Sequence, residues 1–120
     1  MARSLVIKVT AGAEAPERCN QAFTVAAAAL ASGAEVSLWL TGESSWFAVP
    51  GRAEGFSLPH AAPLPELLGS VLEAGTVTVC TQCAARRELT REDLLEGVRI
   101  AGAPTFVAET LAEGAQALVY

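Results

Sequence analysis

Two cysteines and two arginines stand close together in the second half of the chain. Cys80 ends the apolar, β-branched run 77–80, Cys83 follows three residues later, and Arg86 and Arg87 come just beyond. A strand that passes into a helix here would place Cys80 beside free backbone N–H groups and the positive end of a helix dipole. Such surroundings favour the thiolate, which is the reactive form of cysteine. The segment therefore predicts a nucleophilic or sulfur-carrying thiol.

The Cys-x-x-Cys spacing leaves three kinds of chemistry open. A redox pair would cycle between dithiol and disulfide, but Thr81-Gln82 separates the cysteines, without the proline and the preceding aromatic expected of a thioredoxin-type site. A zinc site needs a second pair of ligands, and only Cys19 and His60 remain, so the sequence argues against a metal. In the third interpretation Cys80 is a single nucleophile, and Cys83 is a helper or a spectator.

Other side chains have secondary parts in this hypothesis. Thr81 is expected to cap a helix that carries Cys83 in its first turn and, with Arg86 and Arg87, to bind an anion or substrate. Cys19, inside an alanine-rich segment, is interpreted as a small buried apolar residue. His60 precedes a helix and could approach the thiol as a base, although a surface or capping role is the stronger expectation.

Composition and charge limit the possible partners. The 120 residues fit one domain, 1–120, and 52% hydrophobic residues predict a filled core. A net charge of −5 and a pI near 4.8 argue against nucleic acid or an anionic membrane as the main partner. Half of the eight basic residues nevertheless follow the cysteine pair: Arg86, Arg87, Arg91 and Arg99. A local positive patch of this kind suits a small anion, although each arginine could equally lie on a solvated helix face.

The sequence predicts a cytoplasmic protein. The polar N-terminus passes directly into the apolar run 5–9 and does not resemble a signal peptide. The longest uncharged run, 19–34, is too short to span a membrane. An odd number of cysteines without a secretory signal indicates thiols, redox groups or ligands, and not a disulfide framework.

Apolar runs and breaker residues predict strands that alternate with helices. Strands are expected over 5–10, 34–41, 76–80, 98–100 and 115–120. Helices are expected over 17–32, 63–75, from 81 onward, 90–97 and 104–114. Strand–helix–strand spacing favours parallel neighbours and right-handed crossovers. The predicted fold class is α/β: a single-domain, three-layer α/β/α arrangement with a mainly parallel sheet of about five strands.

Residues 42–59 show neither the periodicity of a helix nor that of a strand, and they are predicted to form a long loop. Such loops in small domains are usually functional or mobile. The aromatic residues Trp46, Phe47 and Phe56 are expected to pack the loop onto the body or into a neighbouring subunit.

The cysteine segment resembles the active-cysteine segment of DsrE/TusD-like (DsrE/DsrF-like) sulfurtransferases. The likeness rests on Val79-Cys80, then Arg86-Arg87, then Leu89-Thr90, and on the Gly-Val-x-Ile-x-Gly stretch at 97–102. The pattern of elements extends it over essentially the whole chain. Glu88 departs from the pattern, because the family usually has glycine after the arginines.

The resemblance implies that Cys80 accepts a sulfane sulfur as a persulfide and passes it to a partner protein's cysteine. Cys83 could then resolve the persulfide as a disulfide. No metal or cofactor is implied, and the expected partners are sulfur donor and acceptor proteins. Family members also form homo-oligomers or hetero-hexamers, for which Trp39, Trp46 and Phe47 are interface candidates. The alternatives are a non-catalytic oligomeric binding protein of the same fold and a small thiol redox protein.

Overall fold

Strands and helices alternate along the chain, as the sequence predicts. A computed structural model describes residues 3–120. The strands are β1 (Ser4–Val9), β2 (Glu35–Leu40), β3 (Thr76–Cys80), β4 (Arg99–Ala101) and β5 (Ala115–Val119). The α-helices are α1 (Pro16–Ala31), α2 (Leu64–Ala74), α3 (Thr81–Arg86) and α4 (Ala103–Thr110). Short 3₁₀ helices are η1 (Gly42–Ala48), η2 (Ala53–Gly55) and η3 (Arg91–Asp93).

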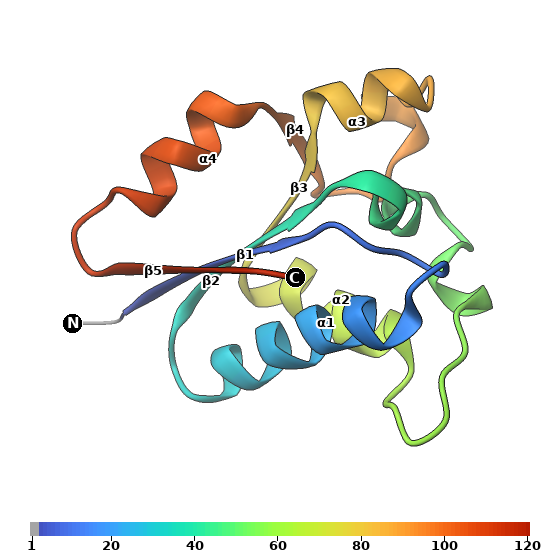
Figure 1. Ribbon diagram of the computed structural model, residues 1–120, viewed down its shortest axis with the longest axis horizontal. Coiled ribbons are helices and arrows are strands. Elements are labelled where there is room, and N and C mark those ends of the chain that lie inside the picture. The colour runs from blue at the N-terminus through green and yellow to red at the C-terminus, as the bar shows by residue number, and fades with distance from the viewer. Residues whose placement is uncertain (1–2) are drawn as a thin grey trace.

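The five strands form one parallel sheet in the order β4-β3-β2-β1-β5 (Figure 1). All carboxyl ends therefore meet at one edge of the sheet. At this edge Cys80 of β3 lies opposite Ala101 of β4. The predicted parallel α/β fold is confirmed.

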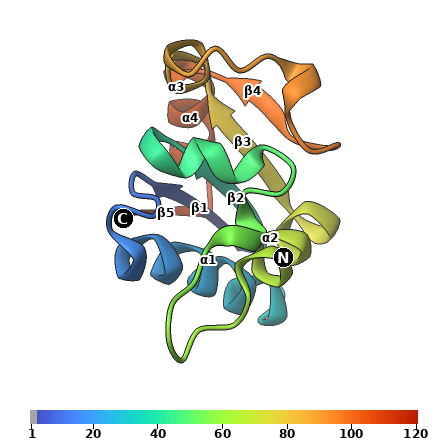
Figure 2. The same cartoon turned by 90° about the vertical axis from the view of Figure 1, so that its right-hand side faces the viewer.

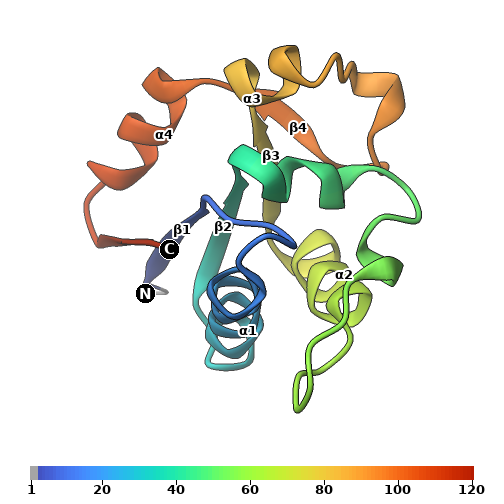
Figure 3. The same cartoon turned by 45° about the vertical axis from the view of Figure 1, so that its right-hand side comes forward.

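Helices cover both faces of the sheet. Helices α1 and α2 pack on one face, and α4 lies on the other (Figures 1 and 3). Because side chains alternate along a strand, Val77 and Val79 enter the core under α1 and α2, whereas Thr78 and Cys80 belong to the α4 face. The α4 layer is the thinner of the two, since one short helix forms most of it.

A polar network holds α4 to the sheet. The Glu109 carboxylate accepts hydrogen bonds from Ser37 Oγ (2.6 Å), Trp39 Nε1 (2.9 Å) and Arg99. The Arg99 Nε also donates to Thr78 Oγ1. Partial burial raises the pKa of Glu109, but these hydrogen bonds outweigh it and hold the pKa below its usual value.

Two of the three aromatic residues expected at an interface, Trp39 and Phe47, are buried within the chain. Trp39 is 1% exposed, and Phe106 meets it edge to face at 5.3 Å. Phe47 is 5% exposed and packs between Phe23 and Phe56. Trp46 is half-buried beneath the guanidinium of an arginine in the same loop. The expectation that Phe47 packs its loop onto the body is confirmed.

Two segments differ from their predictions. The predicted loop 42–59 contains η1 and η2, because a capping box between Thr41 and Ser44 starts η1. The predicted helix 90–97 shrinks to η3, although its capping box between Thr90 and Asp93 is present. Both short helices are local turns set by side-chain capping, which apolar periodicity does not detect.

Candidate functional site

Cys80 lies at the carboxyl end of β3 and is the N-cap residue of α3. Its side chain is half-buried. The prediction that Thr81 is the cap is wrong by one residue: Thr81 begins the helix, is exposed, and no side chain caps this end. The reason is that the extended backbone of β3 ends at Cys80, and helical geometry starts immediately afterwards.

Cys83 occupies the first turn of α3 and is 8% exposed. Its Sγ accepts a hydrogen bond from the backbone N–H of Gly42 at 3.3 Å. Both cysteines are free thiols, as is Cys19. The two thiols of the Cys-x-x-Cys motif are therefore unequal, because one is partly open to solvent and the other is held beneath the loop after β2.

The loop after β2 reaches Cys83 only because position 42 is glycine. Gly42 has a φ of +54°, and a Cβ there would lie 2.6 Å from the Thr10 carbonyl oxygen. Nearby, a Cβ on Gly12 would lie 2.8 Å from the Glu43 backbone. These close approaches join the loops that follow β1 and β2. Figure 2 shows η1 crossing in front of the carboxyl ends of the strands.

Arg87 is tied to the same loop. Its guanidinium pairs with the Glu43 carboxylate at 2.8 Å and also donates to the Cys83 carbonyl at 3.1 Å. The hydrogen bond from Arg87 holds the pKa of Glu43 below its usual value. Arg87 thus braces α3 against the loop, and the Glu43 charge offsets its own.

The predicted patch of four arginines is reduced by such pairs. Arg99 pairs with Glu109 beneath α4, as Arg87 does with Glu43. Arg86 is exposed, contacts Gln82 at 3.4 Å, and has no carboxylate within ion-pair distance among residues 3–120. Of the two arginines predicted to bind an anion, Arg86 keeps the less compensated charge.

Sequence reasoning gave no role at the site to several residues that lie near α3. A Cβ on Gly102 would lie 3.6 Å from Thr81 Oγ1, so the turn between β4 and α4 borders the start of α3. This turn ends the Gly-Val-x-Ile-x-Gly stretch, which supplies β4. The sequence contains one indication that Gly42 and Glu43 lie near the site: both directly follow the end of the predicted strand 34–41.

Glu88 adopts a left-handed conformation, with a φ of +55°. It follows the C-cap of α3, where the N–H of Leu89 bonds to the Ala84 carbonyl at 2.9 Å. This is the C′ position of a Schellman motif, which glycine fills most readily. The helix ending therefore gives a physical reason for glycine at a position where this chain has glutamate.

Cys19 and His60 lie away from Cys80. Cys19 is fully buried in the core on α1, and burial, with the nearby Glu14 charge, raises the pKa of its thiol to about 12. His60 is exposed in the segment before α2, which lies far from α3 in all three ribbon views. Within residues 3–120 no group of three or more His, Cys, Asp or Glu side chains is placed to hold a metal ion.

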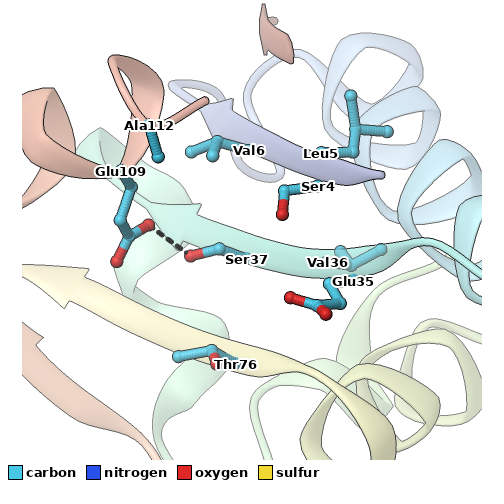
Figure 4. A pocket seen from close by; sticks show the side chains of 9 residues that line it. All are labelled: Ser4, Leu5, Val6, Glu35, Val36, Ser37, Thr76, Glu109 and Ala112. Carbon is cyan, nitrogen blue, oxygen red and sulfur yellow. Dashed lines mark hydrogen bonds between the residues drawn. The ribbon is translucent and has the colours of Figure 1, made fainter. Parts of the chain in front are cut away.

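Two of the cavities lie toward opposite ends of the strands. One of about 250 Å³ lies beside the site and includes Glu43, Trp46 and Arg52 in its lining. The other, about 240 Å³, lies at the opposite, amino end of the strands (Figure 4). There Glu109 reaches from α4 to Ser37, and no cysteine lines the cavity.

The profile of the DsrE/DsrF-like family matches residues 3–120. The chain belongs to this family. The uncharacterized protein MJ0760 of Methanocaldococcus jannaschii is 30% identical over 104 residues, which are 86% of this chain and 38% of that protein. The chain therefore spans well under half the length of this relative.

Two solved structures share the DsrE fold. The YchN protein of E. coli has a TM-score of 0.78 at 17% identity, with 100% of both chains covered. MTH1491 of Methanobacterium thermoautotrophicum, a protein of unknown function, has a TM-score of 0.73 at 10% identity and covers 98% of this chain and 99% of its own. At these identities the likeness concerns the fold. Among residues 3–120, no helix of this DsrE-family chain is long and apolar enough to cross a membrane.

Proposed function

We propose that this chain is a sulfur-relay protein that carries a sulfane sulfur on Cys80 and passes it to a thiol of a partner protein. The observation behind the proposal is the unequal exposure of the thiols. Cys80 is half-buried at the end of a strand, whereas Cys19 and Cys83 are buried. Membership of the DsrE/DsrF-like family is compatible with this role.

The proposed chemistry needs only thiolates and a persulfide donor. The Cys80 thiolate attacks the outer sulfur of a donor persulfide; a new S–S bond forms, the donor's S–S bond breaks, and the donor leaves as a thiolate. In the second half, an acceptor thiolate attacks the outer sulfur on Cys80 and releases Cys80 as a thiolate. The sulfur atom moves without net oxidation or reduction, so neither a metal nor a redox cofactor is required.

Side chains near Cys80 would steer anionic reactants. Arg86 is exposed at the end of α3, and its charge, unlike that of Arg87, is not paired with a carboxylate. Thr81 is exposed beside Cys80 and offers a hydroxyl. Arg87 would contribute mainly by bracing α3 through Glu43. We assign Arg86 and Thr81 to anion binding, and Arg87 to positioning.

A thiol redox pair is the second candidate function. It is favoured by the placement of both motif cysteines within one helical turn, at the N-cap and in the first turn. Against it, Cys83 is buried and its Sγ accepts a hydrogen bond from the Gly42 N–H, whereas Cys80 is partly open to solvent. A reducing compartment such as the cytoplasm suits either function, since both use free thiols.

Intact-protein mass spectrometry tests the proposal. Wild-type protein incubated with a persulfide donor should gain the mass of one sulfur atom, which a reducing thiol then removes. Cys80→Ser should gain none, and Cys83→Ala should still gain it. A redox pair would instead lose two hydrogens in the wild type, and neither single variant would lose them. Wild-type protein that never gains sulfur would contradict the relay.

A further inference from the structure

A cavity of about 250 Å³ lies among the loop after β1 and the helices η1 and η2. Trp46 and Phe56 are half-buried in its wall, and Glu14 and Glu43 line it from the two loops. Helix η1 crosses the carboxyl ends of the strands, so the cavity lies at the edge of the sheet that carries Cys80 (Figure 2). Aromatic rings combined with carboxylates bind organic cations. The transfer chemistry proposed above leaves this cavity without a role.

A cation of this chain already lies in the cavity. The Arg52 guanidinium lies over the Trp46 ring, with its Cζ atom 4.4 Å from the ring centroid. Its charge also reaches Glu43: after the hydrogen bond from Arg87, it is one of the causes that lower the pKa of that carboxyl. Among residues 3–120 no carboxylate lies within ion-pair distance of Arg52, which is exposed. A contact with one ring face holds a cation only weakly at an exposed site, so another cation could take its place.

Glu14 brings a carboxylate that no basic side chain pairs with in the described part of the chain. Its Oε1 accepts a hydrogen bond from the Gly12 N–H at 2.6 Å, whereas Glu43 pairs with Arg87. A Cβ on Gly12 would lie 2.8 Å from the Glu43 backbone, so the loops that carry the two carboxylates are in close contact. A cation that enters the cavity would therefore meet the Glu14 charge.

We propose that the cavity binds an arginine side chain of a partner protein, which replaces Arg52 over Trp46 and pairs with Glu14. The contact between Arg52 and Trp46 is the reason to choose arginine. A planar guanidinium packs on an aromatic face, and its fork of N–H groups matches a carboxylate. The net charge of −5 on this chain also favours a basic partner.

The position of the cavity favours a protein as the source of this arginine. Cys80 and Arg87 are separated by about 10 Å along α3, and Glu43 joins Arg87 to the cavity. An extended segment that presents a thiol to Cys80 would reach the cavity with an arginine about five residues from its own cysteine. The inference rests here on the proposed function, because the partner is the protein that gives sulfur to Cys80 or takes it away.

Nuclear magnetic resonance of the whole chain tests the binding, because its two tryptophans give two indole N–H signals. Trp39 is buried and its indole donates to Glu109, so only the Trp46 signal should move when acetyl-Gly-Arg-Gly-amide is added. Free arginine should bind about threefold more weakly, since its own carboxylate is repelled by Glu14. A Trp46 signal that the tripeptide does not move, or that acetyl-Gly-Gln-Gly-amide moves equally, would overturn the binding. Free arginine that binds as tightly as the tripeptide would overturn a protein source.

Two variants should change the binding of the tripeptide in opposite directions. Arg52→Gln removes the internal competitor and should lower the dissociation constant by about threefold, whereas Glu14→Gln should raise it by about threefold. The matched controls are Arg3→Gln and Glu73→Gln, exposed positions near the amino ends of β1 and β3. They make the same changes in net charge and should have little effect. Weaker binding by Arg52→Gln, or a control that acts as strongly as its counterpart, would overturn the proposal.

Sulfur release connects the cavity to Cys80. Loaded protein should pass its sulfur to a peptide with a cysteine and an arginine five residues apart, and glutamine in place of that arginine should slow the transfer by about threefold. Equal rates in a protein that binds the tripeptide would overturn the docking of a partner here. The binding measurement needs no sulfur, so a chain that binds the tripeptide but never loads would contradict the relay while the cation site stands.

Discussion

The backbone N–H of Gly42 donates a hydrogen bond to the Sγ of Cys83 across 3.3 Å. One residue on, the Glu43 carboxylate pairs with Arg87, one turn further along α3. The loop after β2 thus contacts α3 at Cys83, in its first turn, and at Arg87, its C-cap residue. Cys80, at the start of the same helix, is half-buried and partly open to solvent. The loop therefore fixes the Cys83 thiol and leaves the Cys80 thiol partly accessible to solvent.

Cys83→Ala should weaken the fold and leave sulfur loading in place. We expect a loss of about 1–2 kcal/mol in the free energy of unfolding, from lost burial and the lost hydrogen bond to Gly42. Urea unfolding measures the stability, and mass spectrometry measures the loading of Cys80. Cys19→Ala is the control, because it removes a buried thiol on the α1 side of the sheet. A folded Cys83→Ala protein that cannot be loaded would show that Cys83 takes part in the chemistry.

The two arginines should differ in their effect on anionic reagents. Arg86→Gln should slow the reaction of Cys80 with a negatively charged aromatic disulfide by about twofold to fivefold, through the loss of local attraction. Glu43→Gln should speed this reaction, since it leaves the Arg87 charge uncompensated. Stopped-flow absorbance gives both rates.

A neutral dipyridyl disulfide provides the control for these rates. Its reaction should change little in either variant, because the effect is electrostatic and should also weaken in high salt. Equal slowing of the neutral and the charged reagent by Arg86→Gln would contradict a steering role and indicate a change in the shape of the site.

Glu88→Gly should stabilise the protein. Glu88 has a φ of +55°, which costs a residue with a side chain about 1 kcal/mol relative to glycine. Chemical denaturation should show a gain of that order. Glu88→Ala separates conformation from charge, since it removes the carboxylate and keeps the strained backbone. If alanine stabilises as much as glycine, the gain arises from charge and not from the left-handed conformation.

Glu109→Gln should loosen α4 and alter the response to acid. The pKa of Glu109 is lowered in the folded chain, so its contribution to stability is present above the ordinary pKa of a glutamate. That contribution is lost as the pH falls through the folded pKa. At neutral pH the free energy of unfolding of the variant should be about 1–2 kcal/mol lower than that of the wild type, because Arg99 loses its charged partner.

Thermal unfolding at neutral and acidic pH measures both effects. The difference between wild type and Glu109→Gln should shrink as the pH falls. Glu113→Gln, an exposed glutamate one turn on, is the matched control and should change little. A difference that stays constant with pH would contradict the role given to the Glu109 carboxylate.

The fold and the position of Cys80 could be predicted because both depend on local pattern. The β-branched residues of 76–80 and the breaker Gly75 mark β3 in the sequence, and the alternation of elements implies a parallel sheet. The neighbours of the thiols could not be predicted in the same way. Arg87 and Glu43 are 44 residues apart, and their pairing depends on how two loops fold over the sheet edge.

The partners of the arginines in the predicted patch could not be predicted from the sequence either. Sequence gives the number and spacing of the arginines, but Arg99 turns beneath α4 to Glu109 and Arg87 turns to Glu43. Their partners lie on other elements, so only the tertiary structure shows that both charges are offset. The left-handed conformation of Glu88 likewise follows from the way α3 ends. The absence of the family's glycine at position 88 could suggest this conformation but could not establish it.

The central claim is that Cys80 alone carries the sulfur. Its most direct test is persulfide loading of a variant in which Cys80 is the only cysteine left, Cys19→Ala with Cys83→Ala, followed by mass mapping of the peptide that contains residues 77–86. One added sulfur atom is expected on that peptide, and an acceptor thiol should release it. A folded variant that takes up no sulfur, while the variant lacking only Cys80 does, would contradict this claim.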